Sequence, residues 1–153
     1  VNSAPVLTAI PAQAIAERGI FVSPTNVIDY RRIEKGGRGA ERRELNRIWR
    51  ELLAAGVSFA ASSDAGVTDM MYDDYALIPE LMVAELGLTP LEALSACTRT
   101  AAGTLGLEDE LGTLEGGRTA DLVAVRGNPF EDIHSLRRIR LVMRSGKVLF
   151  QQP

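Results

Sequence analysis

The chain contains 153 residues, of which 46% are hydrophobic and 24% charged, and its formal net charge is −3. This composition is that of a globular protein with one ordinary core, and it excludes disordered, fibrous and membrane-spanning chains. Arginines between positions 42 and 50 alternate with glutamates along a helical pattern, which indicates a solvated helix face. We therefore expect neither a nucleic-acid partner nor a membrane partner.

The opening residues lack the basic flank and long apolar core of a signal peptide or a membrane helix. The chain begins with Val1, and a start without methionine suggests that upstream residues were removed or never included. Cys97 is the single cysteine, which excludes an internal disulfide, and the small residues around it indicate a packing role. One cysteine is compatible with a reducing compartment, and we expect the protein to be located in the cytoplasm.

The first half of the sequence predicts helices that alternate with short strands. A helix spans Ala12 to Arg18, and a strand covers Ile20 to Ser23. Apolar residues at three- and four-residue steps predict a helix from Ala40 to Ala55, which Gly56 ends. This helix leads into an apolar strand from Val57 to Ser63. Strand, helix and strand in this order build parallel sheets with right-handed crossovers.

The second half predicts two more helices and then a small β unit. An acidic loop at 67–74 precedes a helix from about Tyr75 to Leu86. The segment Thr-Pro-Leu-Glu at 89–92 has the residues of a capped helix start, and this helix should continue to about Leu105. Residues 112–153 then read as a β unit with turns. Its three β-like runs are Leu122 to Val125, Ile139 to Met143 and Val148 to Phe150.

Asp64 stands directly after the apolar strand that begins at Val57. A strand without charge until its last position is typical of a parallel sheet that is buried on both faces. The carboxyl ends of such strands hold ligands and metals in barrels and doubly wound folds, so Asp64 is a candidate for chemistry. Asp also caps turns and helices, and the residues alone leave both explanations open.

Several motifs occur together in this chain. They are Gly-Val-Ser-Phe-Ala-Ala-Ser-Ser-Asp-Ala-Gly at 56–66, Gly-Leu-Thr-Pro-Leu-Glu-Ala-Leu-Ser-Ala-Cys-Thr-Arg-Thr-Ala-Ala at 87–102, Leu-Glu-Asp-Glu-Leu-Gly-Thr-Leu-Glu-Gly-Gly-Arg-Thr-Ala-Asp-Leu-Val-Ala-Val at 107–125, Gly-Asn-Pro-Phe-Glu-Asp-Ile at 127–133 and Val-Met-Arg-Ser-Gly-Lys-Val at 142–148. In this order, they make the chain resemble the C-terminal part of the metal-dependent amidohydrolase superfamily. The branch is the one with imidazolonepropionase-like enzymes and Xaa-Pro dipeptidase relatives.

The resemblance implies an α/β fold: the C-terminal portion of a (β/α)8 TIM-like barrel plus part of a small β-sandwich. By this resemblance, residues 1–107 supply the last strands and helices of the barrel, and residues 108–153 supply the C-terminal share of the sandwich. The segment 20–23 matches the seventh barrel strand, and the segment 57–63 matches the eighth.

The resemblance also assigns a role to Asp64, as a ligand at the metal site and as the catalytic acid and base. A divalent metal, with zinc expected, lowers the pKa of bound water toward ~7 and polarises the scissile carbonyl. The carboxylate accepts a proton from this water and later gives it to the leaving nitrogen. The implied reaction is hydrolysis of a C–N bond in a small-molecule amide, cyclic amide or dipeptide. The residues that bind the substrate stay unknown.

The family draws its other metal ligands from a His-x-His pair, a middle-strand Lys or Glu, and histidines on strands five and six, and this sequence contains none of these segments. A closed barrel also needs about 250 residues. We therefore expect the isolated chain to be inactive and to associate with itself or with the missing part of the barrel. The alternative is a non-enzymatic binding or assembly module that pairs with another chain.

Three other polar positions have simpler expected roles. His134, the only histidine, is expected on a surface loop away from the site, and Asp121 is expected to order a turn. In the loop at 67–74, Asp73 or Asp74 is expected to cap a helix. The alternative is that these acids contact a cationic group of the substrate.

Overall fold

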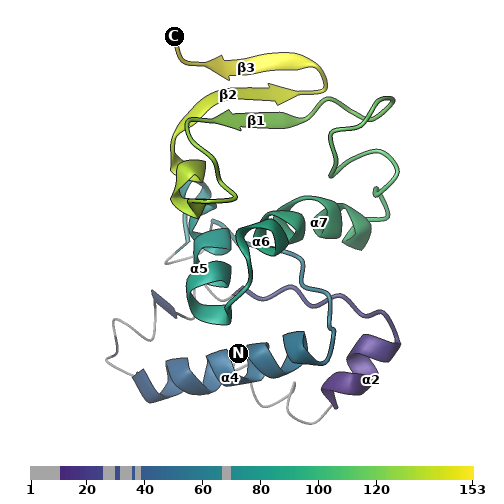
Figure 1. Cartoon of the computed structure of the whole chain (residues 1–153), viewed down its shortest axis with the longest axis vertical. Helices are drawn as coiled ribbons and strands as arrows, with labels where there is room; N and C mark the ends of the chain where they lie inside the picture. Colours follow the sequence, from purple (N-terminus) through teal and green to yellow (C-terminus); the bar gives the residue numbers. More distant parts are fainter. Residues whose placement is uncertain (1–10, 26–29, 32–35, 37–38, 67–69) are drawn as a thin grey trace.

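The computed structural model describes residues 11–25, 30–31, 36, 39–66 and 70–153. Its helices are α2 (Ala12–Glu17), α4 (Gly39–Ala54), α5 (Leu77–Leu86), α6 (Pro90–Cys97) and α7 (Arg99–Thr104), with the short 3₁₀ helices η1 (Tyr72–Asp74) and η2 (Ile133–Arg137). The strands are β1 (Leu122–Val125), β2 (Ile139–Arg144) and β3 (Lys147–Gln151). The sheet lies at one end of the molecule, α5, α6 and α7 lie in the middle, and α2 and α4 lie at the other end (Figure 1).

The longest helix, α4, confirms the helix predicted from Ala40 to Ala55 to within one residue at each end. Leu45, Ile48, Trp49 and Leu52 are buried on its inner face, as the three- and four-residue spacing requires, and Leu53 is partly buried beside them. Trp49 contacts Phe59 edge to face, with 5.7 Å between the ring centroids. Gly56 has a φ of +84° and turns the chain from this helix into the next segment.

Helix α5 begins two residues later than the sequence predicted, because η1 precedes it. It ends at Gly87, which has a left-handed φ of +79°. The Leu88 N–H donates to the Met82 carbonyl at 3.2 Å, which satisfies one of the last carbonyl groups of the helix. Within the described part of the chain, none of the helices is both long and apolar enough to cross a bilayer.

The capped start predicted at 89–92 is confirmed. The Glu92 N–H donates to Thr89 Oγ1 at 3.3 Å, and the Thr89 N–H donates to Glu92 Oε2 at 2.7 Å. Two of the N–H groups that a helix start leaves unpaired are therefore satisfied reciprocally.

The single helix predicted from 90 to about 105 was wrong, because the helix breaks at Thr98. This residue has φ −128° and ψ −91°, and it separates α6 from α7. Its hydroxyl donates to the Leu94 carbonyl at 2.7 Å, and its N–H donates to the Ser95 carbonyl at 3.2 Å. A threonine hydroxyl that competes in this way for the carbonyl four residues back is a known cause of helix bending.

The two barrel strands predicted at 20–23 and 57–63 lie side by side and are parallel, but their pairing is much shorter than predicted. A single parallel bridge joins Val22 to Phe59. The Val22 N–H donates to the Ser58 carbonyl at 3.0 Å, and the Ala60 N–H donates to the Val22 carbonyl at 3.0 Å. The predicted order of strand, helix and strand is therefore present as two short segments that flank α4 and are joined by this single bridge.

The pairing stops after Ala60 because Pro24, the next residue in register on the other segment, has no N–H to donate to the Ala60 carbonyl. The Ala61 N–H donates to the Ala96 carbonyl of α6 at 2.9 Å. The Ser23 hydroxyl donates to the Ala60 carbonyl at 3.2 Å and closes the other segment. Val57 and Phe59 lie in the main core, whose buried members come largely from α2, α4, α5, α6 and these segments. They include Ile15, Leu52, Phe59, Met70, Ile78, Met82 and Ala93.

The β unit is a three-stranded antiparallel sheet in the order β1-β2-β3. Val123 pairs with Val142, and Val142 pairs with Phe150. The three predicted runs are therefore confirmed, and β2 and β3 extend slightly beyond them. Asp121 orders a turn as predicted, because its Oδ1 accepts from the Ser145 N–H at 2.6 Å in the β2–β3 connection.

Candidate active site

Asp64 lies at the end of the segment that carries the parallel bridge, and it is exposed. Its φ is +49°, a left-handed value that non-glycine residues seldom adopt and that Asp tolerates better than most. Within the described residues, its carboxylate accepts no hydrogen bond. The capping explanation therefore finds no partner there, and the carboxylate is available to other groups. Strained backbone of this kind is concentrated at functional sites.

The turn after Asp64 is closed by backbone and by an aromatic side chain. Gly66 has a φ of +100°, and its N–H donates to the Met70 carbonyl at 3.1 Å. The Tyr72 hydroxyl lies over Gly66, so close that a Cβ atom at position 66 would be 3.0 Å from it. Tyr72 is nevertheless 79% exposed, so the ring covers the turn on one side and meets solvent on the other.

Asp74 fixes the start of η1, as the capping explanation predicted. Its Oδ2 accepts from the Met71 N–H at 3.0 Å. The Arg31 guanidinium donates to both oxygens of the same carboxylate, at 2.7 and 2.8 Å. Residues 67–69 of the predicted acidic loop lie outside the described residues. The cation that Asp74 binds in this structure is thus a side chain of the same chain.

Arg31, and then the Met71 N–H, lower the pKa of Asp74 from 3.8 to about 2. Since the pKa in the folded protein lies below that of the unfolded chain, this pair stabilises the fold fully above the ordinary carboxyl value. Its contribution is lost as the pH falls from about 4 to about 2. We expect the free energy of unfolding, measured by urea titration at several pH values, to fall less steeply over this range in Asp74→Asn than in the wild type. Identical slopes would contradict the assignment.

The described residues do not form a complete metal site. Among them, no three His, Cys, Asp or Glu side chains lie close enough together to hold a metal ion. A catalytic metal needs about three protein ligands, and Asp64 supplies one carboxylate. The described residues therefore supply at most one of the protein ligands that such a metal needs, and we assign no chemical step to a metal here.

Cys97 agrees with its predicted packing role. Burial raises the pKa of its thiol to about 12, although a hydrogen bond with Tyr75 acts in the opposite direction. The thiol is thus neutral at physiological pH and is a poor nucleophile.

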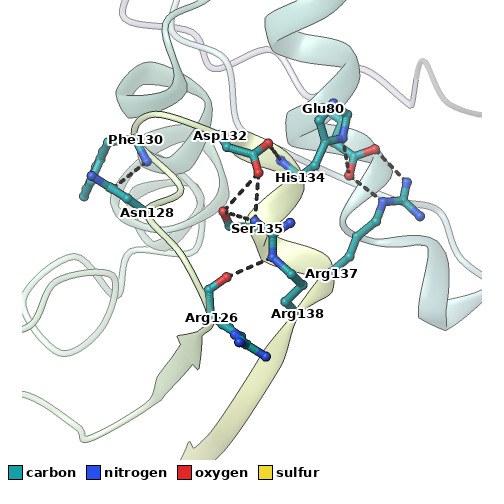
Figure 2. Close-up of polar contacts among 9 residues, drawn as sticks. All are labelled: Glu80, Arg126, Asn128, Phe130, Asp132, His134, Ser135, Arg137 and Arg138. Carbon is teal, nitrogen blue, oxygen red and sulfur yellow. Dashed lines mark hydrogen bonds and ion pairs between the residues drawn. The ribbon is translucent and has the colours of Figure 1, made fainter.

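A second charged cluster joins α5 to η2, and sequence reasoning missed it (Figure 2). The Glu80 side chain is 7% exposed, and its carboxylate accepts from Arg137 at 2.5 and 2.6 Å. His134 Nδ1 lies 3.2 Å from Glu80 Oε1. Burial alone would raise the pKa of Glu80, but the hydrogen bonds from Arg137 and His134 lower it below the usual value. His134 is exposed as predicted, but it lies on η2 rather than on a loop and has a specific partner.

Asp132 precedes η2 and caps it as its N-cap residue, whereas Asp74 lies within η1 and reaches back to the N–H of the N-cap residue Met71. Its Oδ1 accepts from the His134 N–H at 3.1 Å, and its Oδ2 accepts from Arg138 at 2.8 Å (Figure 2). Gly127 allows a close approach here, since a Cβ atom at position 127 would lie 2.8 Å from the Ser135 hydroxyl. This second cap belongs to the β unit.

The family of the chain follows from comparison with known proteins. A model of the amidohydrolase family matches residues 2–150, so the chain belongs to this family. It is 29% identical over 105 residues to an imidazolonepropionase of Shouchella clausii, and the aligned region covers 67% of this chain and 24% of that protein. It is 39% identical over 84 residues to an imidazolonepropionase of Deinococcus deserti, covering 55% of this chain and 21% of that protein.

A solved structure shows the same arrangement. The structure of a Xaa-Pro dipeptidase with methionine bound in its active site superposes on this chain with a TM-score of 0.82 and 27% sequence identity. The match covers 92% of this chain and 37% of the dipeptidase chain. The resemblance inferred from the motifs is therefore confirmed. The chain spans about a quarter of the length of the curated relatives that it matches.

Proposed function

We propose that this chain forms part of a hydrolase that cleaves a C–N bond in an amide, cyclic amide or dipeptide. Membership of the amidohydrolase family supports the reaction class, and the imidazolonepropionase and Xaa-Pro dipeptidase relatives support the substrate class. The observation that carries the proposal is the position of Asp64. It is an exposed carboxylate in a left-handed backbone conformation at the end of a parallel segment.

The role proposed for Asp64 is that of general base and then general acid. Its carboxylate accepts a proton from the attacking water as the water oxygen bonds to the carbonyl carbon. It then gives this proton to the nitrogen as the C–N bond breaks, so the base is regenerated. A positioned side chain of this kind contributes about 10²–10⁴-fold to the rate.

The proposal requires elements beyond those that the structure describes. Residues 1–107 would supply the last strands and helices of a barrel, and residues 108–153 would supply part of a β-sandwich. The other barrel strands would provide the remaining ligands of a divalent metal, which we expect to be zinc, and Asp64 would be one ligand among them. The isolated chain would then be inactive.

The assembly module is the second candidate, and exposed apolar side chains favour it. Leu105 is 71% exposed, Leu114 is 79% exposed and Phe150 of the edge strand β3 is 44% exposed. Unpaired edges and apolar surface of this kind promote association. Both candidates predict that the isolated chain self-associates on gel filtration, so hydrolysis is the measurement that separates them.

The test compares the isolated chain with the complete natural polypeptide or complex, each supplied with zinc. The substrates are a five-membered cyclic amide, an Xaa-Pro dipeptide and a linear N-acyl amide, and the measurement is the release of amine or the opening of the ring. We expect turnover of at least one substrate by the complete protein and none by the isolated chain. Failure of the complete protein on all three substrates would favour the assembly module.

A further inference from the structure

We propose that Arg31 and Asp74 are positioning residues, which hold the turn that carries Asp64 in its reactive geometry. The inference rests on the proposed function, because it assigns these residues to the same reaction. Neither residue is adjacent to Asp64 in the sequence. A continuous set of contacts connects them to it, through η1 and the ring of Tyr72.

The first step is the anchoring of η1. Arg31 forms two parallel hydrogen bonds to Asp74, a geometry that fixes both orientation and distance. The side chains are only 30% and 26% exposed, so solvent screens the pair less than it screens an ordinary surface ion pair. The same carboxylate accepts from the Met71 N–H. The ion pair therefore fixes the backbone at the start of η1.

The second step is the contact between η1 and the turn. Tyr72 is the first residue of η1, and its hydroxyl lies over Gly66. Gly66 is also tied to Met70 by a backbone hydrogen bond, so the turn is held at two points. Asp64 lies two residues earlier with a φ of +49°. A strained residue keeps such a conformation only where its surroundings determine it.

The consequence is a defined position for the Asp64 carboxylate. A carboxylate that moves by about 1 Å can lose about 10²-fold in rate, although it is still present. If the Arg31–Asp74 pair is weakened, η1 and Tyr72 become free to shift, and the turn that carries Asp64 can relax. The expected defect is in turnover rather than in substrate binding.

The test uses the complete active protein with Asp74→Asn. Asparagine can still accept from the Met71 N–H, so this change removes the charge of the ion pair and keeps the cap. We expect kcat to fall by about 10- to 100-fold, with KM changed less than about twofold. Arg31→Lys, which keeps the charge but loses the paired hydrogen bonds, should give a smaller loss of kcat.

Asp132→Asn is the matched control, because Asp132 also caps a 3₁₀ helix and also binds an arginine. It should leave kcat and KM unchanged. Equal kcat values for Asp74→Asn, Arg31→Lys and the wild type would overturn the inference. A failure of the proposed function is distinct from this result, since it would show as undiminished turnover in Asp64→Asn.

Discussion

Replacement of Asp64 with asparagine is expected to lower kcat of the complete protein by about 10²–10⁴-fold. Asparagine has nearly the same shape as aspartate and tolerates the left-handed backbone, so the fold should be retained. Its amide cannot accept the proton of the attacking water. Because the lost group acts in the transition state, KM should change much less than kcat.

The measurement is steady-state hydrolysis with the best substrate from the assay above, together with thermal unfolding. Asp121→Asn is the control, since Asp121 accepts a backbone hydrogen bond that asparagine can also accept. It should keep the wild-type kcat. If Asp64→Asn also kept the wild-type kcat, Asp64 could not be the acid and base.

Arg137→Met is expected to lower the free energy of unfolding by about 2–3 kcal/mol. The change leaves Glu80 buried without its paired hydrogen bonds, and breaking a buried ion pair on one side costs about 3–5 kcal/mol. We expect less than this because the Arg137 side chain is 54% exposed and His134 still contacts Glu80. The loss should be visible as a lower urea midpoint.

Two variants make this prediction specific. Arg47→Met removes an arginine whose partners Glu44 and Glu51 have side chains 57% and 59% exposed, and it should cost much less than Arg137→Met. The double variant Glu80→Met/Arg137→Met removes both partners, and it should recover most of the lost stability. If Arg47→Met and Arg137→Met were equally destabilising, the buried position of Glu80 would have no special importance.

Local patterns in the sequence predicted the helices well, but not their interruptions. The spacing of apolar residues in α4 and the Thr89 cap depend on neighbours three or four residues away, so both can be inferred from a short window. The break at Thr98 depends on where its hydroxyl points, because a threonine in an unbroken helix has the same sequence signal. The Val22–Phe59 pairing is short because Pro24, the next residue in register, has no N–H, and this limit could be read from the sequence.

The residues of the two polar clusters also divide into those that a local sequence pattern reveals and those that it does not. Asp64 was found because it ends an apolar run, which is a local pattern. The Arg31–Asp74 pair joins residues 43 positions apart, and the Glu80–Arg137 pair joins residues 57 positions apart. No periodicity connects such residues, and only the fold brings them together. For Glu80, the available signal was an acid within a largely apolar helix, which indicates a buried charge that needs a partner, but Glu85 in the same helix carries the same signal.

The most direct test of the hydrolytic assignment is a crystal structure of the complete protein with a non-hydrolysable amide analogue bound. The quantity to measure is the distance from the nearer Asp64 oxygen to the nitrogen of the bond that would be cleaved, or to the water poised to attack it. We expect about 2.6–3.2 Å, within hydrogen-bond reach. An Asp64 carboxylate that faces bulk solvent in that complex, with the analogue beyond the reach of one bridging water, would contradict the account.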